Sequence, residues 1–153
     1  MDISFAVEKT LGRLAKWLRI LGFDTLYEEG LPSGSFDKIV LNRVLLTRKK
    51  KNPLIESSSH SIFIHSNHYL KQLEEVINDL GITLMSIKPF SRCVRCNTLI
   101  ENISKKGLRG KVPDYIWEVH DEFKICNRCK RIYWAGTHTV NSLEKVKELF
   151  LPQ

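Results

Sequence analysis

Residues 3–27 read ISFAVEKTLGRLAKWLRILGFDTLY and contain a strand, a helix and a second strand in succession. An apolar run over residues 3–8 ends in Glu8 and predicts the first strand. Within residues 10–21 apolar side chains recur every three or four positions, which predicts a helix, and Gly22 marks its end. The second strand is expected just after Asp24. A strand that returns after a helix normally lies parallel to the first, so this segment predicts a parallel sheet.

The chain continues this alternation as far as residue 87. The expected elements are a loop over 30–35, a short helix over 36–42, strands over 44–47 and 61–66, an amphipathic helix over 68–80 and a strand over 82–87. The pattern predicts an α/β fold in three layers, with helices on both faces of a parallel sheet. We expect a boundary near residues 88–90, which divides the chain into a first domain over 1–89 and a second over 90–153.

The four cysteines form two Cys-X-X-Cys pairs. These are Cys93 with Cys96 and Cys126 with Cys129, separated by 29 residues. Two such pairs can supply the thiolates of a tetrahedral site, for which Zn²⁺ is the best-suited common ion. Disulfides, in any of three pairings, would need an oxidising compartment that nothing in the sequence indicates. A redox-active pair would not need the second pair. The spacing therefore predicts a structural zinc site.

The sequence around the cysteines is typical of a small zinc ribbon. Alternating apolar residues flank each pair and predict short strands with metal-binding turns between them. Residues 97–122 predict a loop-rich connection with one helical turn after Pro113. A final short helix is expected to be capped by Asn141 or Ser142. Because so small a module buries little apolar area, we expect the metal to supply much of its folding free energy.

The composition limits the class of protein. With 42% hydrophobic and 27% charged residues, the chain is not disordered, collagen-like or of low complexity. No apolar run approaches the roughly 18 residues that span a bilayer, and no secretory signal is visible, so we expect no membrane partner and a cytoplasmic location. The formal net charge is +7, and residues 90–153 carry most of it, with 12 basic and 7 acidic side chains. Such a balance favours an anionic partner, nucleic acid first, although it is also compatible with solubility alone.

Five motifs occur in a fixed order: LGRLAKWLRILGFD at 11–24, LLTR at 45–48, RCVRCN at 92–97, the cysteine pair at 126–129 and YWAGTH at 133–138. In this order they resemble the Mut-seven C-terminal RNase family, in which a PIN-like nuclease domain precedes a zinc ribbon. The first and last motifs are specific, whereas LLTR or a single cysteine pair would be weak alone. The resemblance covers nearly the whole chain. It implies a PIN-like α/β/α fold, RNA as the substrate and a divalent metal at an acidic site.

The acidic site that the resemblance implies is only partly present. PIN-like nucleases gather carboxylates at the C-terminal edge of the sheet, where Mg²⁺ or Mn²⁺ activates water and neutralises developing charge. Glu8 stands where the family has an aspartate that closes the first strand. Lys49 and Lys71 stand where the family has carboxylates, and each reverses the local charge. The candidate catalytic residues are therefore Glu8, assisted by Glu28, Glu29 or Asp37.

Basic side chains of the first helix and of the segment after LLTR are candidate RNA contacts, although charged residues on a helix commonly form only its solvated face. These candidates are Arg13, Lys16, Arg19, Arg48 and Lys49. Trp17 and Trp134 are expected to pack in the core and the ribbon rather than to stack on bases.

Three functions remain open at this point. The first is an RNase that uses Mg²⁺ or Mn²⁺, with the ribbon holding the RNA. The second is a catalytically inactive RNA-binding or adaptor protein with a structural zinc ribbon. The third is an inert scaffold whose ribbon contacts other proteins.

Overall fold

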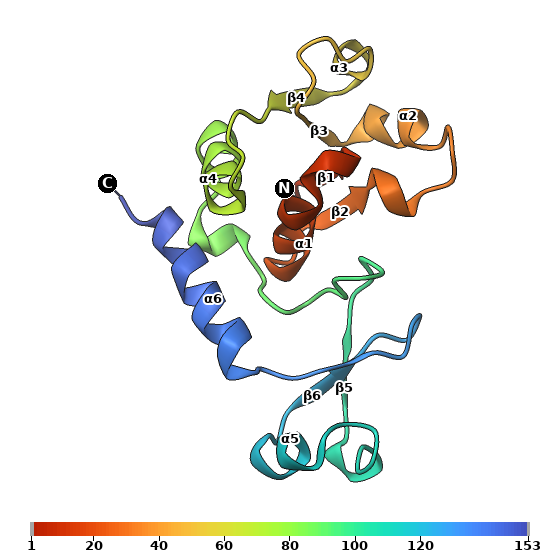
Figure 1. The fold of residues 1–153 in the computed structure, drawn as a ribbon, viewed down its shortest axis with the longest axis vertical. Coiled ribbons are helices and arrows are strands. Elements are labelled where there is room, and N and C mark those ends of the chain that lie inside the picture. Colours follow the sequence, from red (N-terminus) through yellow and green to blue (C-terminus); the bar gives the residue numbers. More distant parts are fainter. Residues whose placement is uncertain (1, 153) are drawn as a thin grey trace.

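Residues 2–152 are described in the computed structural model, and the first part of the chain forms a four-stranded sheet (Figure 1). Its strands are β1 (Ser4–Val7), β2 (Asp24–Tyr27), β3 (Val44–Thr47) and β4 (His60–Phe63), in the order β2-β1-β3-β4. Neighbouring strands are parallel, which confirms the prediction from sequence. Because Val7 pairs with Leu46, the residues that follow β1 and β3 meet at one edge of the sheet.

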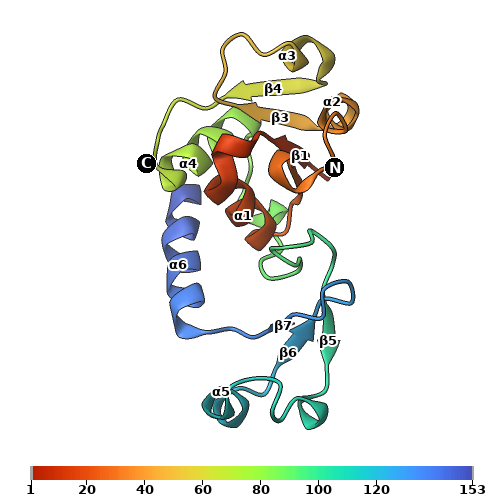
Figure 2. The same cartoon turned by 45° about the vertical axis from the view of Figure 1, so that its right-hand side comes forward.

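Helices cover both faces of this sheet, as the alternating pattern predicted (Figure 2). Helices α1 (Gly12–Ile20) and α4 (Tyr69–Leu80) pack on the face that receives Phe5 and Val7. Helices α2 (Phe36–Ile39) and α3 (Leu54–Ser57) pack with Ala6 and Leu45 on the opposite face. Alternate residues of β1 thus enter two separate cores, as the pleat of a strand requires. Short 3₁₀ helices complete the connections at Lys9–Leu11, Glu28–Gly30, Val40–Asn42, Leu84–Ser86, Lys105–Gly107 and Glu148–Phe150.

The strand expected over residues 82–87 is wrong. Helix α4 ends at Gly81, which adopts a left-handed conformation with φ 61°, and the chain then forms the 3₁₀ helix at Leu84–Ser86. The side chains of Thr83 and Ser86 hydrogen-bond within this turn, which competes with strand pairing. Met85 is 96% exposed, so the apolar run that suggested a buried strand is not buried as a whole.

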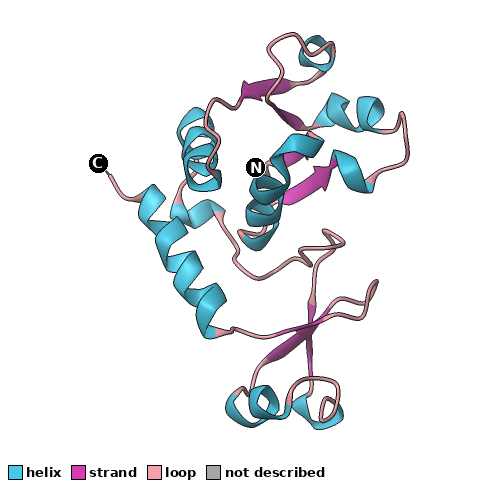
Figure 3. Cartoon of the chain, viewed as in Figure 1, coloured by secondary structure: helices cyan, strands magenta, loops and turns pink. Residues whose placement is uncertain are grey.

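A second sheet follows, with three short antiparallel strands (Figure 3). Its strands are β5 (Glu101–Ile103), β6 (Phe123–Ile125) and β7 (Ile132–Tyr133), in that order. Helix α5 (Asp114–Val119) begins directly after Pro113, where a helical turn was expected. The small core of this part contains Leu108, Val112, Ile116 and Phe123.

The last helix returns to the first sheet (Figure 1). Helix α6 runs over Thr137–Lys147 with Gly136 at its N-cap, so the N-cap predicted at Asn141 or Ser142 is five or six residues late. Its Leu143 and Val146 are buried in the same core as α1 and α4. The chain therefore leaves the parallel sheet after α4, builds the second sheet and comes back. No helix within residues 2–152 combines the length and apolar character needed to cross a membrane.

Candidate functional site

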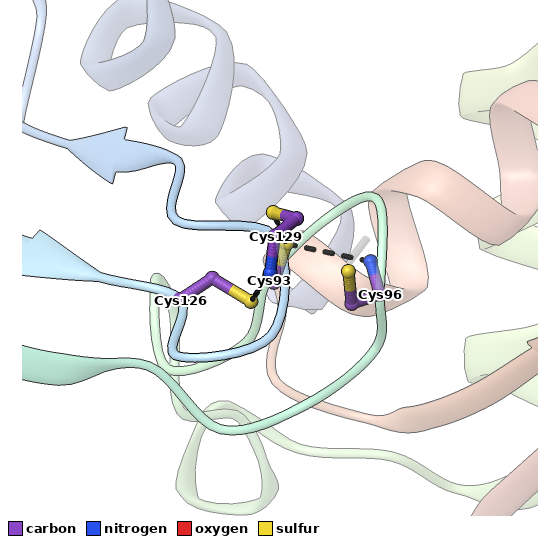
Figure 4. A group of neighbouring side chains, drawn as sticks. All are labelled: Cys93, Cys96, Cys126 and Cys129. Atoms are coloured by element: carbon purple, nitrogen blue, oxygen red, sulfur yellow. Dashed lines mark hydrogen bonds between the residues drawn. The ribbon is translucent and has the colours of Figure 1, made fainter.

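The four cysteines come together at the turns of the second sheet (Figure 4). One sulfur atom from each of Cys93, Cys96, Cys126 and Cys129 lies within 4.8 Å of the others, and the Sγ atoms of Cys93 and Cys129 are 3.7 Å apart. A tetrahedral Zn²⁺ with Zn–S bonds of about 2.3 Å separates its sulfurs by roughly 3.8 Å. The group can therefore hold a metal such as zinc, and its architecture is compatible with a zinc ribbon.

Each cysteine pair is shaped by the same backbone turn. The residue after each pair, Asn97 or Lys130, has a left-handed backbone with φ 67° or 64°. The N–H of Asn97 donates to the carbonyl of Cys93, and that of Lys130 donates to the carbonyl of Cys126. Backbone N–H groups also point at sulfur, at 3.3 Å from Cys96 N to Cys93 Sγ and 3.5 Å from Cys129 N to Cys126 Sγ. This repeated geometry directs both pairs toward one point, which is what a single ion needs.

The thiols differ in how readily they lose a proton. Burial raises the pKa of Cys126, but hydrogen bonds from the Thr98 hydroxyl and from backbone N–H groups outweigh it and lower the pKa to about 6. Burial and the neighbouring cysteines raise the pKa of Cys96 to about 12. Four thiolates at neutral pH therefore require a compensating cation, which a bound metal supplies.

The first cysteine turn is fastened to α1 and β2. Asn97 accepts a hydrogen bond from Thr25 N (2.9 Å) and donates one to the Asp24 carboxylate (2.7 Å). Arg19 donates to the carbonyls of Thr25, at 2.9 Å, and of Val94, at 2.9 Å. The ribbon is thus joined to the parallel sheet by buried polar contacts. The guanidinium of Arg19 is committed to this junction, and its role as an RNA contact stays a prediction.

Gly22 makes the close approach of the two parts possible. Its φ of 97° is left-handed, and a Cβ at this position would lie 2.4 Å from the carbonyl oxygen of Lys88. The Lys88 N–H donates to the carbonyl of Leu21, and Phe90 N–H donates to that of Ile20. The glycine that marks the end of the first helix in the sequence therefore also admits the segment that leads into the ribbon.

Glu8 lies at the C-terminal edge of the parallel sheet, where the first strand ends. Its side chain is buried, and its residue is only 2% exposed. Its carboxylate accepts hydrogen bonds from the hydroxyl of Thr10 (2.8 Å), the hydroxyl of Thr47 (2.7 Å) and the backbone N–H of Arg48 (2.7 Å). The carboxylate thus joins the ends of β1 and β3 and accepts one hydrogen bond from each of three groups.

The other acidic candidates lie around this edge without forming a cluster with Glu8. The Glu28 carboxylate accepts from Lys9 N at 2.8 Å, and Glu29 accepts from the Tyr27 hydroxyl at 3.0 Å. Asp37 is exposed in the first turn of α2. Among residues 2–152, the cysteines are the one group of three or more metal-binding side chains whose ligand atoms lie mutually close. The structure therefore does not bring Glu8, Glu28, Glu29 and Asp37 together as an obvious carboxylate site.

The basic candidates differ in how free their charges are. Arg48 donates to the carbonyls of residues 64–66 and to the side chain of Asn67, so it fastens the loop after β4. Arg13 lies over the ring of Tyr69 at 4.2 Å. Lys16 and Lys49 are exposed, and their ammonium groups have no hydrogen bond or ion pair within the described residues. Among the candidates, Lys16 and Lys49 are thus the ones whose positive charges are available to an RNA phosphate.

A cleft of about 710 Å³ separates α1, the ribbon and α6. Arg13 and Lys16 line it from α1, Trp134 from the ribbon, and His138 and Lys145 from α6. The sequence singled out the α1 side but missed Lys145. The signal was present, because His138, Ser142 and Lys145 are spaced three or four apart on one helix face. A helix predicted to begin at residue 141 excluded His138 and concealed that spacing.

Comparisons with known proteins bear on this site at the level of family. The family model described as the Mut7-C RNAse domain matches residues 3–146, which span both sheets and all four cysteines. Comparisons with curated proteins and with solved structures found no match. With nearly the full length matched, the chain belongs to the Mut7-C RNAse domain family.

Proposed function

We propose that this chain binds RNA through an RNase-type fold whose acidic site no longer supports metal-dependent cleavage. The observation that carries the proposal is the use of Glu8 within the protein: its buried carboxylate already accepts three hydrogen bonds, and it belongs to no close group of three or more metal-binding side chains among residues 2–152. A catalytic Mg²⁺ or Mn²⁺ ion is held by carboxylate oxygens that remain open to it, together with waters and substrate phosphates. Glu8 offers one carboxylate, and it serves to join β1 and β3.

The charge beside Glu8 supports the same proposal. Lys49, Lys50 and Lys51 follow β3 directly and are exposed at this edge. Their ammonium groups repel a divalent cation and attract phosphate oxygens. The edge therefore suits the backbone of an RNA strand better than a hydrolytic metal.

The ribbon has a structural part in this proposal. We infer that Cys93, Cys96, Cys126 and Cys129 hold one Zn²⁺, which supplies folding free energy to a module with a small core. We also retain the division into a first domain over residues 1–89 and a ribbon over 90–153 as part of the proposal. Elemental analysis should give one equivalent of zinc per chain, and the zinc should be absent when Cys93 or Cys126 is changed to Ser.

The test of RNA binding uses a labelled RNA of mixed sequence and fluorescence anisotropy. We expect affinity that falls steeply with salt and is weakened by the double substitution Lys49→Gln and Lys51→Gln. The double substitution Lys106→Gln and Lys111→Gln is the control, because these exposed lysines lie in the ribbon and their removal changes the net charge equally. Affinity that is indifferent to salt would contradict the proposal.

The second candidate is an active RNase that uses Mg²⁺ or Mn²⁺. The family and the position of Glu8 at the C-terminal edge of the sheet favour it. Incubation of the wild-type protein with labelled RNA and Mn²⁺ separates the two candidates. Cleavage that EDTA stops and that Glu8→Gln abolishes, in a variant that still unfolds cooperatively, would establish the RNase and exclude the non-catalytic protein.

A further inference from the structure

We infer that the cleft between α1, the ribbon and α6 is the binding site for a single strand of RNA, with Trp134 stacking on a base. This inference rests on the proposed RNA binding and says which surface of the protein the RNA contacts. The cleft has a volume of about 710 Å³, within the range of roughly 300–1,000 Å³ that is typical of small-molecule sites. A space of that size admits a nucleotide of a single strand, whereas a duplex keeps its bases stacked and out of reach of the walls.

The charge of the cleft favours an anion. Five lysine and arginine side chains line it against one acidic side chain, Glu122. Two of the basic groups are committed within the protein, since Arg92 donates to the carbonyls of Gly22 and Asn97 and Lys124 donates to that of Phe90. The other three remain at the cleft, and these are Arg13, Lys16 and Lys145.

Lys16 and Lys145 face the cleft from opposite walls. Lys16 belongs to α1 and Lys145 to α6, both are exposed, and neither has an ion-pair partner among residues 2–152. An anion in the cleft can be attracted by both ammonium groups, because neither is neutralised within the protein. A phosphate backbone supplies that anion, so the pair is suited to hold an RNA strand from both sides.

Aromatic rings give the same cleft a surface for bases. Trp134 and Phe90 line it and both residues are only partly buried, whereas the ring of Tyr69 is already stacked with Trp17 and His68 and covered by Arg13. Trp134 packs edge-on against Phe123 of the ribbon core, with ring centroids 6.4 Å apart, which fixes its position. Stacking of bases on such rings contributes about 1–3 kcal/mol per base in proteins that bind single strands. The combination of free cations and a partly exposed ring matches the two chemical parts of an RNA strand, its phosphates and its bases.

The cleft is also connected to the edge of the parallel sheet. A smaller hollow of about 150 Å³ shares Arg13 and Tyr69 with the cleft and is also lined by Thr10 and Asn67. Thr10 donates to Glu8, and Asn67 accepts from Arg48. One strand can thus pass from the lysines after β3, over Arg13 and Tyr69, into the cleft, which links the proposed phosphate-binding lysines at the edge with the ribbon.

The first test measures tryptophan fluorescence during titration with an unlabelled single-stranded RNA of mixed sequence. The chain has three tryptophans, and stacking on Trp134 should quench the wild-type signal. The variant Trp134→Phe should lose most of the quench. Trp117→Phe is the matched control, because Trp117 is also a half-buried ribbon residue but does not line the cleft. All variants should first show one equivalent of zinc and cooperative unfolding.

The second test measures affinity and its salt dependence by anisotropy. The double substitution Lys16→Gln and Lys145→Gln should bind more weakly than the control Lys106→Gln and Lys111→Gln. The slope of log affinity against log salt should be shallower by about 0.7 for each RNA phosphate that the variant no longer neutralises. A hairpin duplex with the same bases should compete poorly for the wild-type protein.

The outcomes separate this inference from the proposed function. If RNA binds in a salt-dependent manner but Trp134→Phe retains the full quench, or the cleft variant binds like its control, the RNA site lies elsewhere and the inference is wrong. Equal competition by the duplex would overturn it too. If the wild-type protein binds no RNA at low salt, the inference and the proposed function both fail.

Discussion

Glu8, which the sequence predicted to be catalytic, has a clear structural role in the folded protein. Its buried carboxylate accepts from Thr10, Thr47 and the backbone of Arg48, and thereby joins two strands. Charge-assisted hydrogen bonds of this kind each contribute about 1.5–3 kcal/mol. The residue is therefore important for stability whether or not a metal binds.

We predict that Glu8→Ala lowers the free energy of unfolding by about 3 kcal/mol, because it leaves the buried donors of Thr47 and Arg48 without their acceptor. Urea denaturation followed by circular dichroism measures this change. Glu56→Ala is the control, since the exposed side chain of Glu56 has no hydrogen bond or ion pair within residues 2–152, and it should change stability by no more than about 0.5 kcal/mol. Equal effects of the two substitutions would contradict the structural role of Glu8.

Asp24 predicts a dependence of stability on pH. Burial raises the pKa of its carboxyl group, but hydrogen bonds from Arg43 and Asn97 and the charge of Arg43 outweigh burial and hold the pKa below its ordinary value. A depressed pKa stabilises the folded state above the unfolded pKa, and this contribution is lost as pH falls through the folded pKa.

Wild-type protein should therefore be more stable than Asp24→Asn at pH 7, by up to about 1 kcal/mol for a partly exposed pair. The difference should shrink as pH falls below the ordinary pKa of an aspartate, because Asp24 then becomes protonated in the folded protein as well. Parallel urea titrations at a series of pH values measure it. A difference that stays constant down to pH 2 would argue against the ion pair with Arg43.

The sequence indicated which residues are special better than it indicated which groups they contact. The cysteine cluster was predicted from the spacing of two Cys-X-X-Cys pairs, together with a compartment that does not favour disulfides. Arg19 and Arg48 resembled surface cations, yet their guanidinium groups bond backbone carbonyls of loops distant in sequence. No local pattern specifies such contacts, because they depend on where the loops lie after folding.

Among the elements, those with a strong period were predicted best. The strand over 44–47 has the observed bounds of β3, and α4 begins one residue after the predicted start. The failure over 82–87 arose because an apolar run alone does not say whether a partner strand is available. The late start of α6 arose because Gly136 caps the helix without a side chain that could announce it.

We expect the first cysteine turn to lose its shape when the proposed zinc is removed. We predict that treatment with a chelator accelerates hydrogen exchange at the Thr25 amide, which donates to Asn97 in that turn. Thr25 belongs to the outer strand β2, so this amide reports on the ribbon junction rather than on the sheet. The central strand β3 supplies the control, since the Leu45 amide should remain protected. Unchanged exchange at Thr25 in verified metal-free protein would show that the turn holds its shape without metal.

For the molecule as a whole, α6 determines how the two sheets are joined. It lies beyond the ribbon in sequence but packs Leu143 and Val146 into the core of α1 and α4. Together with the junction at Asn97 and Arg19, it attaches the ribbon to the parallel sheet at two places. The boundary proposed at residue 89 marks where the chain leaves the first sheet. The sequence did not indicate that α6 packs back against the helices of that sheet.

We predict that Leu143→Ala destabilises the molecule by about 2–5 kcal/mol, as expected when a buried leucine leaves a cavity. Leu151→Ala is the matched control, because Leu151 is 57% exposed and its truncation should change stability by no more than about 0.5 kcal/mol. Thermal unfolding followed by circular dichroism compares the two. A destabilisation confined to the control, or absent from both, would mean that α6 contributes little to the core.

The return of α6 also sets an order of events during synthesis on the ribosome. Leu143 and Val146 follow every cysteine in the sequence, so α6 can complete the hydrophobic cover of α1 and α4 only after the residues of the ribbon have been synthesised. Until those two side chains arrive, the nascent chain exposes apolar surface on α1 and α4, the kind of surface that chaperones recognise.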